Sequence, residues 1–149
     1  ITGDPGLGKS KTLQSIAHRL EQIPDLTVGV MQRPQSALSD FYRELGELFN
    51  VGLSPANRYG GFKALRTRWK NHCQSTLLRP VLLIDEAQQV STECLTELRL
   101  LQSHHFDSQN LLFTILCGDS RLPERFRTTD LLPLGSRIGA RVVLSPLSP

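Results

Sequence analysis

The eight residues Gly3-Asp4-Pro5-Gly6-Leu7-Gly8-Lys9-Ser10 constrain this chain more than any other part of its sequence. They fit the pattern G-x-x-x-x-G-K-[S/T], whose glycines let the backbone curl so that successive N–H groups point inward at phosphate groups. An amphipathic segment follows directly, and the N-terminus of a helix also favours anions. The motif therefore predicts a P-loop, a phosphate-binding turn between a strand and a helix.

This loop also predicts individual contacts to a bound nucleotide. Lys9 would reach the β- and γ-phosphates, and the hydroxyl of Ser10 would ligate Mg²⁺. The full set of expected nucleotide-binding residues is Asp4, Pro5, Gly6, Leu7, Gly8, Lys9, Ser10 and Lys11.

A second motif is the apolar run Val81–Ile84, which ends in Asp85 and Glu86. An apolar strand that ends in two carboxylates after a P-loop is typical of a Walker B element. Asp85 would hold the Mg²⁺, directly or through water, and Glu86 would orient and deprotonate the attacking water. The N/T-K-x-D pattern of guanine-specific proteins is absent, and a kinase would need a phosphate-acceptor site instead. The two motifs together predict hydrolysis of ATP with Mg²⁺.

Two further polar positions are candidates for the same site. The apolar run Leu111–Cys117 is followed by a glycine and two polar residues, and a polar side chain at the tip of a strand beside the P-loop can touch the γ-phosphate. Asp119 is the first candidate for this role and Ser120 the second, and the alternative is a plain turn with Gly118 at positive φ. Arg137 precedes the last expected strand and is either a surface arginine or, in a ring or filament, a finger that enters the neighbour's site.

The net charge of +3 conceals a basic segment. No acidic residue occurs from Leu48 to Ile84, whereas the same stretch holds Arg58, Lys63, Arg66, Arg68, Lys70 and Arg79. A segment of one sign suggests a polyanionic partner, and the alternative is a solvated helix face. The candidate nucleic-acid contacts are Arg58, Lys63, Arg66 and Lys70.

Apolar runs alternate with amphipathic segments, which predicts the α/β class with a parallel sheet covered by helices. Helices are expected at residues 9–23, from a cap at Ser36 to about residue 49, at 62–77 and after a cap at Ser91, with partial helix over 122–135. A first strand is expected to end at residues 1–2. Four further strands are expected at residues 26–31, 81–84, 111–117 and 142–144.

The composition fits one ordinary globular domain: 149 residues, of which 39% are hydrophobic and 21% charged. These values exclude collagen-like, disordered and disulfide-dense classes, and no apolar run is long enough to cross a membrane. Three cysteines without a C-x-x-C pair favour a reducing, cytosolic compartment, and no histidine stands at metal-ligand spacing from them. Because the chain starts at Ile1 inside an expected strand, we interpret it as a piece of a longer protein.

The order of these motifs resembles that of the AAA+ ATPases. The residues that carry the resemblance are the P-loop, the segment Leu83–Gln88 with its Ile-Asp-Glu-Ala-Gln, the strand followed by Gly118 and Asp119, and the ending from Arg137 to Leu147. Within that family, the segment Leu83–Gln88 and the ending are similar to the bacterial branch of ExeA-type ATPases and transposition ATPase subunits (TniB/TnsC-like).

The resemblance implies a P-loop NTPase core of the AAA+ type over residues 1–149, a three-layer sandwich with a five-stranded parallel sheet in the order 5-1-4-3-2. It also implies a preceding segment and a following helical lid that this piece lacks, and subunits that assemble in rings or filaments, with Arg137 acting in trans. The favoured client is a transposase, recruited or activated on duplex DNA. The alternative is assembly of a bacterial secretion channel, with the ATPase working at the inner membrane. The expected location is the bacterial cytoplasm, without membrane insertion by this piece.

Overall fold

The central layer consists of parallel strands. The computed structural model describes residues 1–34, 36–53, 57–104 and 109–146. Three strands form one parallel sheet in the order β2-β3-β6, and a second parallel pair consists of β1 and β7. Their bounds are Leu26–Met31 for β2, Arg79–Ile84 for β3, Phe113–Leu116 for β6, Thr2–Gly3 for β1 and Val143–Leu144 for β7.

The prediction of one continuous five-stranded sheet is wrong. Between β6 and β1 there is a single parallel bridge, Thr2 with Gly118, and the Gly118 N–H donates to the Ile1 carbonyl at 3.0 Å. The pairing of β1 with β7 is also short, since each of these strands contains two residues. The three-stranded sheet therefore meets the two-stranded pair through this bridge and through the Ile1 backbone, whose ammonium also donates to the Leu116 carbonyl at 2.7 Å.

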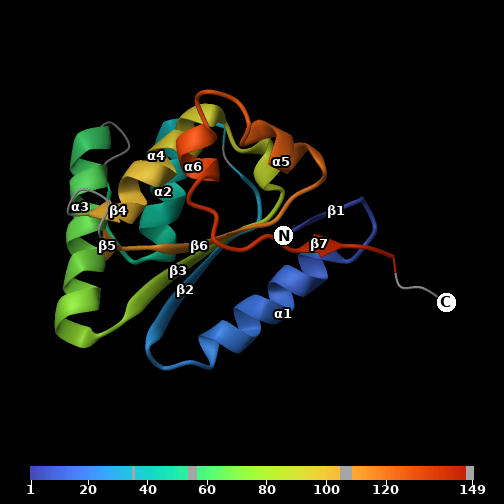
Figure 1. Cartoon of the computed structure of the whole chain (residues 1–149). Helices are drawn as coiled ribbons and strands as arrows, with labels where there is room; N and C mark the ends of the chain where they lie inside the picture. The colour runs from blue at the N-terminus through green and yellow to red at the C-terminus, as the bar shows by residue number, and fades with distance from the viewer. Residues whose placement is uncertain (35, 54–56, 105–108, 147–149) are drawn as a thin grey trace.

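Helices cover both faces of these strands (Figure 1). The longer ones are α1 (Lys9–Glu21), α2 (Leu38–Leu48), α3 (Arg58–Asn71) and α4 (Thr92–Gln102). Shorter elements are the π-helix η1 (His72–Thr76), the 3-10 turn η2 (Ala87–Gln89), α5 (Arg121–Arg125), α6 (Leu132–Gly135) and the antiparallel pair β4 (Ser103–His104) and β5 (Gln109–Asn110).

Strand β3 divides the core into two parts because its successive side chains point to opposite faces. Val81 and Leu83 pack with Leu13 and Ala17 of α1 in one apolar cluster. Leu82 and Ile84 belong to a larger cluster that includes side chains of α2, α3 and α4. Figure 1 shows the same arrangement, with α1 on one side of the strands and α2 and α4 on the other. This is a three-layer α/β architecture.

Several helix boundaries differ from those expected from the sequence. Ser91 caps α4 as predicted, since its hydroxyl accepts from the Cys94 N–H at 3.2 Å. Ser36 does not cap α2: the cap position is Ala37, without a side-chain hydrogen bond. The third helix starts four residues early because Asn57 caps it by accepting from the Gly60 N–H at 2.8 Å. In the part of the chain with described coordinates, no helix combines the length and the apolar character needed to cross a bilayer.

Candidate nucleotide-binding site

The loop between β1 and α1 has the backbone conformation that its glycines allow. Gly6 has φ of 85° and Gly8 has φ of 77°, in the left-handed region that other residues rarely enter. A Cβ added at either position would meet no atom within 4 Å, so the requirement is conformational and not steric. Gly8 is also the N-cap of α1 and no side chain caps that helix. The first N–H groups of α1 are therefore available to an anion.

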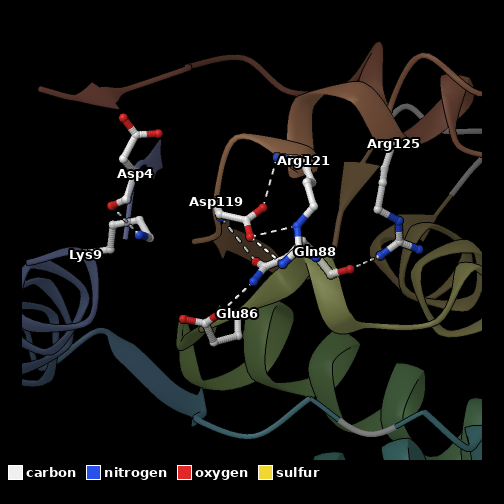
Figure 2. A network of polar contacts seen from close by, with 7 residues as sticks. All are labelled: Asp4, Lys9, Glu86, Gln88, Asp119, Arg121 and Arg125. Atoms are coloured by element: carbon white, nitrogen blue, oxygen red, sulfur yellow. Dashed lines mark hydrogen bonds and ion pairs between the residues drawn. The ribbon is translucent and has the colours of Figure 1, made fainter. Parts of the chain in front are cut away.

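Lys9 is folded into this loop. Its side chain is buried, and its ammonium donates a hydrogen bond to the Asp4 carbonyl at 2.9 Å (Figure 2). Ser10 and Lys11 follow in the first turn of α1, and both are exposed. The Lys9 ammonium thus lies against the backbone of the loop that the motif predicts to bind phosphates.

The two predicted acidic residues lie directly after β3. The Asp85 N–H donates to the Met31 carbonyl at 3.0 Å, which continues the pairing of β2 and β3 by one residue. A carboxylate oxygen of Asp85 accepts from the Glu86 N–H at 2.9 Å. Glu86 has φ of 48°, an uncommon value for a residue with a side chain, and it turns the chain from β3 into η2.

The strand order brings the motifs together. Strand β6 pairs with β3, and Gly118 just after β6 bridges to Thr2 just before the P-loop. Cys117 lies in the middle of this edge. Burial raises the pKa of its thiol, the nearby carboxylate of Asp85 raises it further, and the charge of Lys9 opposes this effect. Lys9 and Asp85 both act on the Cys117 thiol although 76 positions separate them in the chain.

Asp119 lies at the tip of β6 as predicted, but it is not free. The guanidinium of Arg121 donates to one of its carboxylate oxygens from Nε at 2.8 Å and from Nη2 at 2.5 Å. This ion pair lowers the pKa of Asp119. The expected positive φ at Gly118 is wrong, because the positive-φ glycines of the described chain are Gly6 and Gly8. The choice between a nucleotide contact and a plain turn at Asp119 stays open.

Sequence reasoning missed two residues of this region, Gln88 and Arg121. Gln88 contacts both Glu86 and the backbone of Asp119, and Arg121 neutralises Asp119 (Figure 2). The charge of Glu86 also acts on Arg121. Gln88 ends the segment Leu83–Gln88 that carries the family resemblance, but the sequence assigned it no role, and Arg121 belongs to no motif. Each of the two stands two residues beyond a predicted carboxylate, and the pairing of β3 with β6 brings the Asp119 turn to Gln88.

The remaining predicted residues lie elsewhere. Arg137 follows α6 and is exposed, and its Nη1 donates to the hydroxyl of Ser103 at the end of α4 at 2.5 Å. Helix α3, which carries the basic residues, lies at the end of the molecule opposite β1 and β7 (Figure 1). An open depression of about 550 Å³ beside α3 is lined by Lys63, Arg68 and Asn50, among others.

The basic segment is not acid-free in space. Arg58 pairs with Glu97 of α4 at 2.6 Å and approaches Glu93 at 3.8 Å. The Glu97 side chain is 5% exposed and also accepts a hydrogen bond from the Tyr42 hydroxyl at 2.5 Å. Arg58 stays a candidate nucleic-acid contact, but its charge is engaged by Glu97 within the fold. Lys63, Arg66 and Lys70 remain on α3, with the Arg66 guanidinium 5.1 Å above the Phe62 ring.

The oxygen atoms at the site suit Mg²⁺ better than a transition metal. Ser10 offers a hydroxyl and Asp85 a carboxylate, and hard cations prefer such oxygen ligands. Across the described ranges, no cluster of three or more His, Cys, Asp or Glu side chains could hold a metal ion. Mg²⁺ does not require one, because it usually binds through one or two protein oxygens together with water and substrate phosphates. The residues present therefore fit Mg²⁺ brought in with a nucleotide.

Comparison with known proteins identifies the family. The AAA domain family matches residues 1–126. The chain belongs to this family of AAA domains. It is 31% identical over 152 aligned residues to the General secretion pathway protein A of Aeromonas hydrophila, covering 99% of this chain and 27% of that protein. The fold of this AAA domain is similar to that of the crystal structure of Cdc6p from Pyrobaculum aerophilum, with a TM-score of 0.68 at 14% identity, covering 97% of this chain and 38% of the other.

Membership supports the nucleotide-binding P-loop of an AAA+ ATPase. It does not distinguish the transposition branch that the sequence also resembles. The AAA domain described here spans about a quarter of the secretion-pathway relative and less than half of the Cdc6p chain. The process or partner protein that the whole protein serves therefore does not follow from the chemistry of this domain.

Proposed function

We propose that this AAA domain binds ATP with Mg²⁺ and hydrolyses it to ADP and phosphate. The observation that supports the proposal is the meeting of three elements at one edge of the strands. The P-loop follows β1, Asp85 and Glu86 follow β3, and Asp119 follows β6, which lies between them. The P-loop would bind phosphates, Asp85 would bind the metal and Glu86 would act as the base for water, which are the parts that phosphoryl transfer requires, and Asp119 would lie near the γ-phosphate.

Each residue has a definite part in this proposal. Lys9 exchanges the Asp4 carbonyl for phosphate oxygens when the substrate binds. Ser10 and Asp85 hold Mg²⁺, which neutralises charge on the phosphates when bound. Glu86 accepts a proton from water as the water oxygen bonds to the γ-phosphorus and the bond to the β,γ-bridging oxygen breaks.

The test uses two substitutions in the full-length protein. Glu86→Gln keeps the shape of the side chain but removes the base, so ATP should still bind while turnover falls by about 10²–10⁴-fold. Lys9→Ala should weaken ATP binding itself, measured with a fluorescent ATP analogue. Glu21→Gln, an exposed position at the end of α1, is the matched control. Turnover by Glu86→Gln at the wild-type rate under saturating ATP would remove Glu86 from the mechanism.

We further propose that the full-length protein is a self-assembling ATPase of the bacterial cytoplasm that serves a secretion pathway. The support is the 31% identity to the General secretion pathway protein A over almost all of this AAA domain. This was the alternative client in the sequence analysis. A strain whose only copy carries Glu86→Gln should retain the protein but lose export of its secreted substrates, measured in the culture medium.

A second candidate function is binding of duplex DNA in the service of a transposase. The observation that favours it is the face of α3 with Lys63, Arg66 and Lys70, three cations at a spacing of three or four residues. Such contacts would go to phosphates without sequence preference, and their affinity would fall steeply with salt. Measurement of duplex affinity against salt concentration, with ATP present, tests this candidate, and an affinity no stronger than that of a neutral control protein rejects it.

A further inference from the structure

Gln88 bridges two parts of the site that the sequence treats separately. Its side-chain Nε2 donates to Oε2 of Glu86 at 2.5 Å, and its Oε1 accepts from the backbone N–H of Asp119 at 3.2 Å. A carboxylate can only accept and a backbone N–H can only donate, so these partners fix the orientation of the amide. Gln88 is 9% exposed, and both polar atoms of its side chain have partners (Figure 2).

The backbone around Gln88 is held firmly. Nη1 of Arg125 donates to the Gln88 carbonyl at 2.8 Å and to the Val90 carbonyl at 2.5 Å. On the other side, a Cβ added at Gly118 would lie 2.5 Å from Oε1 of Gln88, a distance that real side chains do not tolerate. The glycine before Asp119 is thus what lets the β6 turn approach the amide. The bridge is therefore tightly packed, and a shift of the turn after β6 must displace the Gln88 side chain.

This contact has a consequence for Glu86, the proposed base. The oxygen that accepts from Gln88 has less capacity to accept a hydrogen bond from the attacking water. Asp119, at the other end of the bridge, is the residue expected near the γ-phosphate, and its charge is balanced by Arg121. A γ-phosphate near this ion pair competes with Asp119 for the guanidinium, because both are anionic.

We propose that Gln88 is a positioning residue that couples the turn after β6 to the carboxylate of Glu86, so that a γ-phosphate at Asp119 and Arg121 sets the placement of the base. This inference rests on the proposed ATPase function. It gives Gln88 no contact with the reacting atoms; the residue acts through Glu86. ADP lacks the γ-phosphate and leaves both hydrogen bonds of Gln88 in place, whereas the γ-phosphate releases the Asp119 N–H while Gln88 goes on donating to Oε2 of Glu86, so that the other carboxylate oxygen faces the attacking water.

The first experiment compares substitutions in the full-length protein. Gln88→Met keeps the length of the side chain but removes both hydrogen bonds, and Gln88→Glu keeps an acceptor for the Asp119 N–H while placing a like charge beside Glu86. Both should reduce kcat by about 10–100-fold, the range for a misplaced catalytic group, while ATP affinity stays within about twofold. Gln89→Met, at the exposed neighbouring position, is the matched control and should retain wild-type kcat.

The second experiment does not depend on a variant. Backbone amide exchange over residues 118–121 is measured in the wild-type protein alone, with ADP and with a non-hydrolysable ATP analogue. The Asp119 amide should be equally protected in the first two conditions and should exchange at least about tenfold faster with the ATP analogue. Equal protection with ADP and with the ATP analogue overturns the proposal, even if Gln88→Met fails to fold.

The outcomes separate this inference from the proposed function. A wild-type protein that does not hydrolyse ATP defeats the proposed function, and with it the basis of the coupling. A wild-type protein that hydrolyses ATP, with Gln88→Met and Gln88→Glu at wild-type kcat, defeats the coupling alone. A fall in kcat shared by Gln89→Met also counts against it, because the effect would then belong to the η2 turn in general.

Discussion

Arg58 shows at the residue scale how a charge that has no acidic neighbour in the sequence can have an ion-pair partner in the fold. In the sequence it stands in a segment without acids, whereas in the fold its guanidinium reaches Glu97 of α4. The Glu97 carboxylate is almost wholly buried and is shared with the Tyr42 hydroxyl, whose pKa is raised by burial and then by this hydrogen bond. The cluster therefore ties α2, α3 and α4 together by charge-assisted hydrogen bonds.

Removal of Arg58 should destabilise the protein. Arg58→Met leaves the Glu97 carboxylate buried with one remaining partner, and unpairing a buried charge is costly. Because the Arg58 side chain is 57% exposed and water can reach the pair, we expect a loss of about 1–3 kcal/mol in the free energy of unfolding, measured by urea titration. Lys63→Met, an exposed cation of the same helix, should change it by less than about 0.5 kcal/mol. A loss as small for Arg58→Met as for Lys63→Met would contradict a stabilising role.

The residues that the sequence could predict at the site are those whose role depends on local order along the chain. Gly6 and Gly8 take the left-handed conformations that the motif requires, and Asp85 directly follows a buried strand. Gln88 could not be predicted, because its two partners are two residues and 31 residues away and the second depends on the pairing of β3 with β6. The P-loop motif does not specify the Lys9 contact to the Asp4 carbonyl.

At the scale of elements, burial of β3 on both faces could be predicted from its continuous apolar run, whereas the pairing at the edge of the sheet could not. A continuous apolar strand has to be covered on both faces, and β3 is. The five-stranded sheet failed because β1 and β7 form only two-residue pairings, and sequence pattern does not reveal the length of a ladder. The antiparallel pair of β4 and β5 was missed because its strands are equally short.

Helix α3 carries the element-scale prediction for DNA. Replacing Lys63, Arg66 and Lys70 together by Ala should weaken duplex binding and reduce the slope of log affinity against log salt, because fewer counterions are released. Arg58→Met is the informative comparison: its charge is engaged by Glu97, so it should leave both quantities nearly unchanged. Binding to a defined duplex is measured by fluorescence anisotropy across salt concentrations. If the triple variant keeps the wild-type affinity and slope, α3 presents only a solvated face.

At the scale of the whole molecule, Arg137 belongs to the question of assembly. It lies after α6 and contacts Ser103, outside the group of residues around Lys9, Glu86 and Asp119. The resemblance to AAA+ proteins implies that it completes a neighbour's site, and this stays a prediction. Within one subunit, Arg121 lies beside Asp119 and interacts with the charge of Glu86. Arg121 and Arg137 are therefore alternative candidates for stabilising charge on the γ-phosphate.

Whether Arg137 acts in trans can be tested by mixing variants. Arg137→Ala should still bind ATP but lose about 10³-fold or more in turnover, as expected for an arginine finger. Mixed with Lys9→Ala subunits, it should regain part of the activity, because an intact P-loop of one variant then meets an intact Arg137 of the other. ATPase rate per subunit is measured against total protein concentration and mixing ratio. A mixture that co-assembles but stays inactive would show that Arg137 does not act in trans, and Arg141 would be tested next.

The bridge between Thr2 and Gly118 would give a bound nucleotide a mechanical role. The P-loop follows β1 of the β1–β7 pair and the acidic residues follow β3 of the three-stranded sheet, so a ligand that contacts both would span the place where the pair meets the sheet. Such a ligand acts as a non-covalent cross-link between two separately paired halves. At a hundred times its dissociation constant it would add about 2.7 kcal/mol to the cohesion of the domain. The substrate of this AAA domain would then also be part of its scaffold.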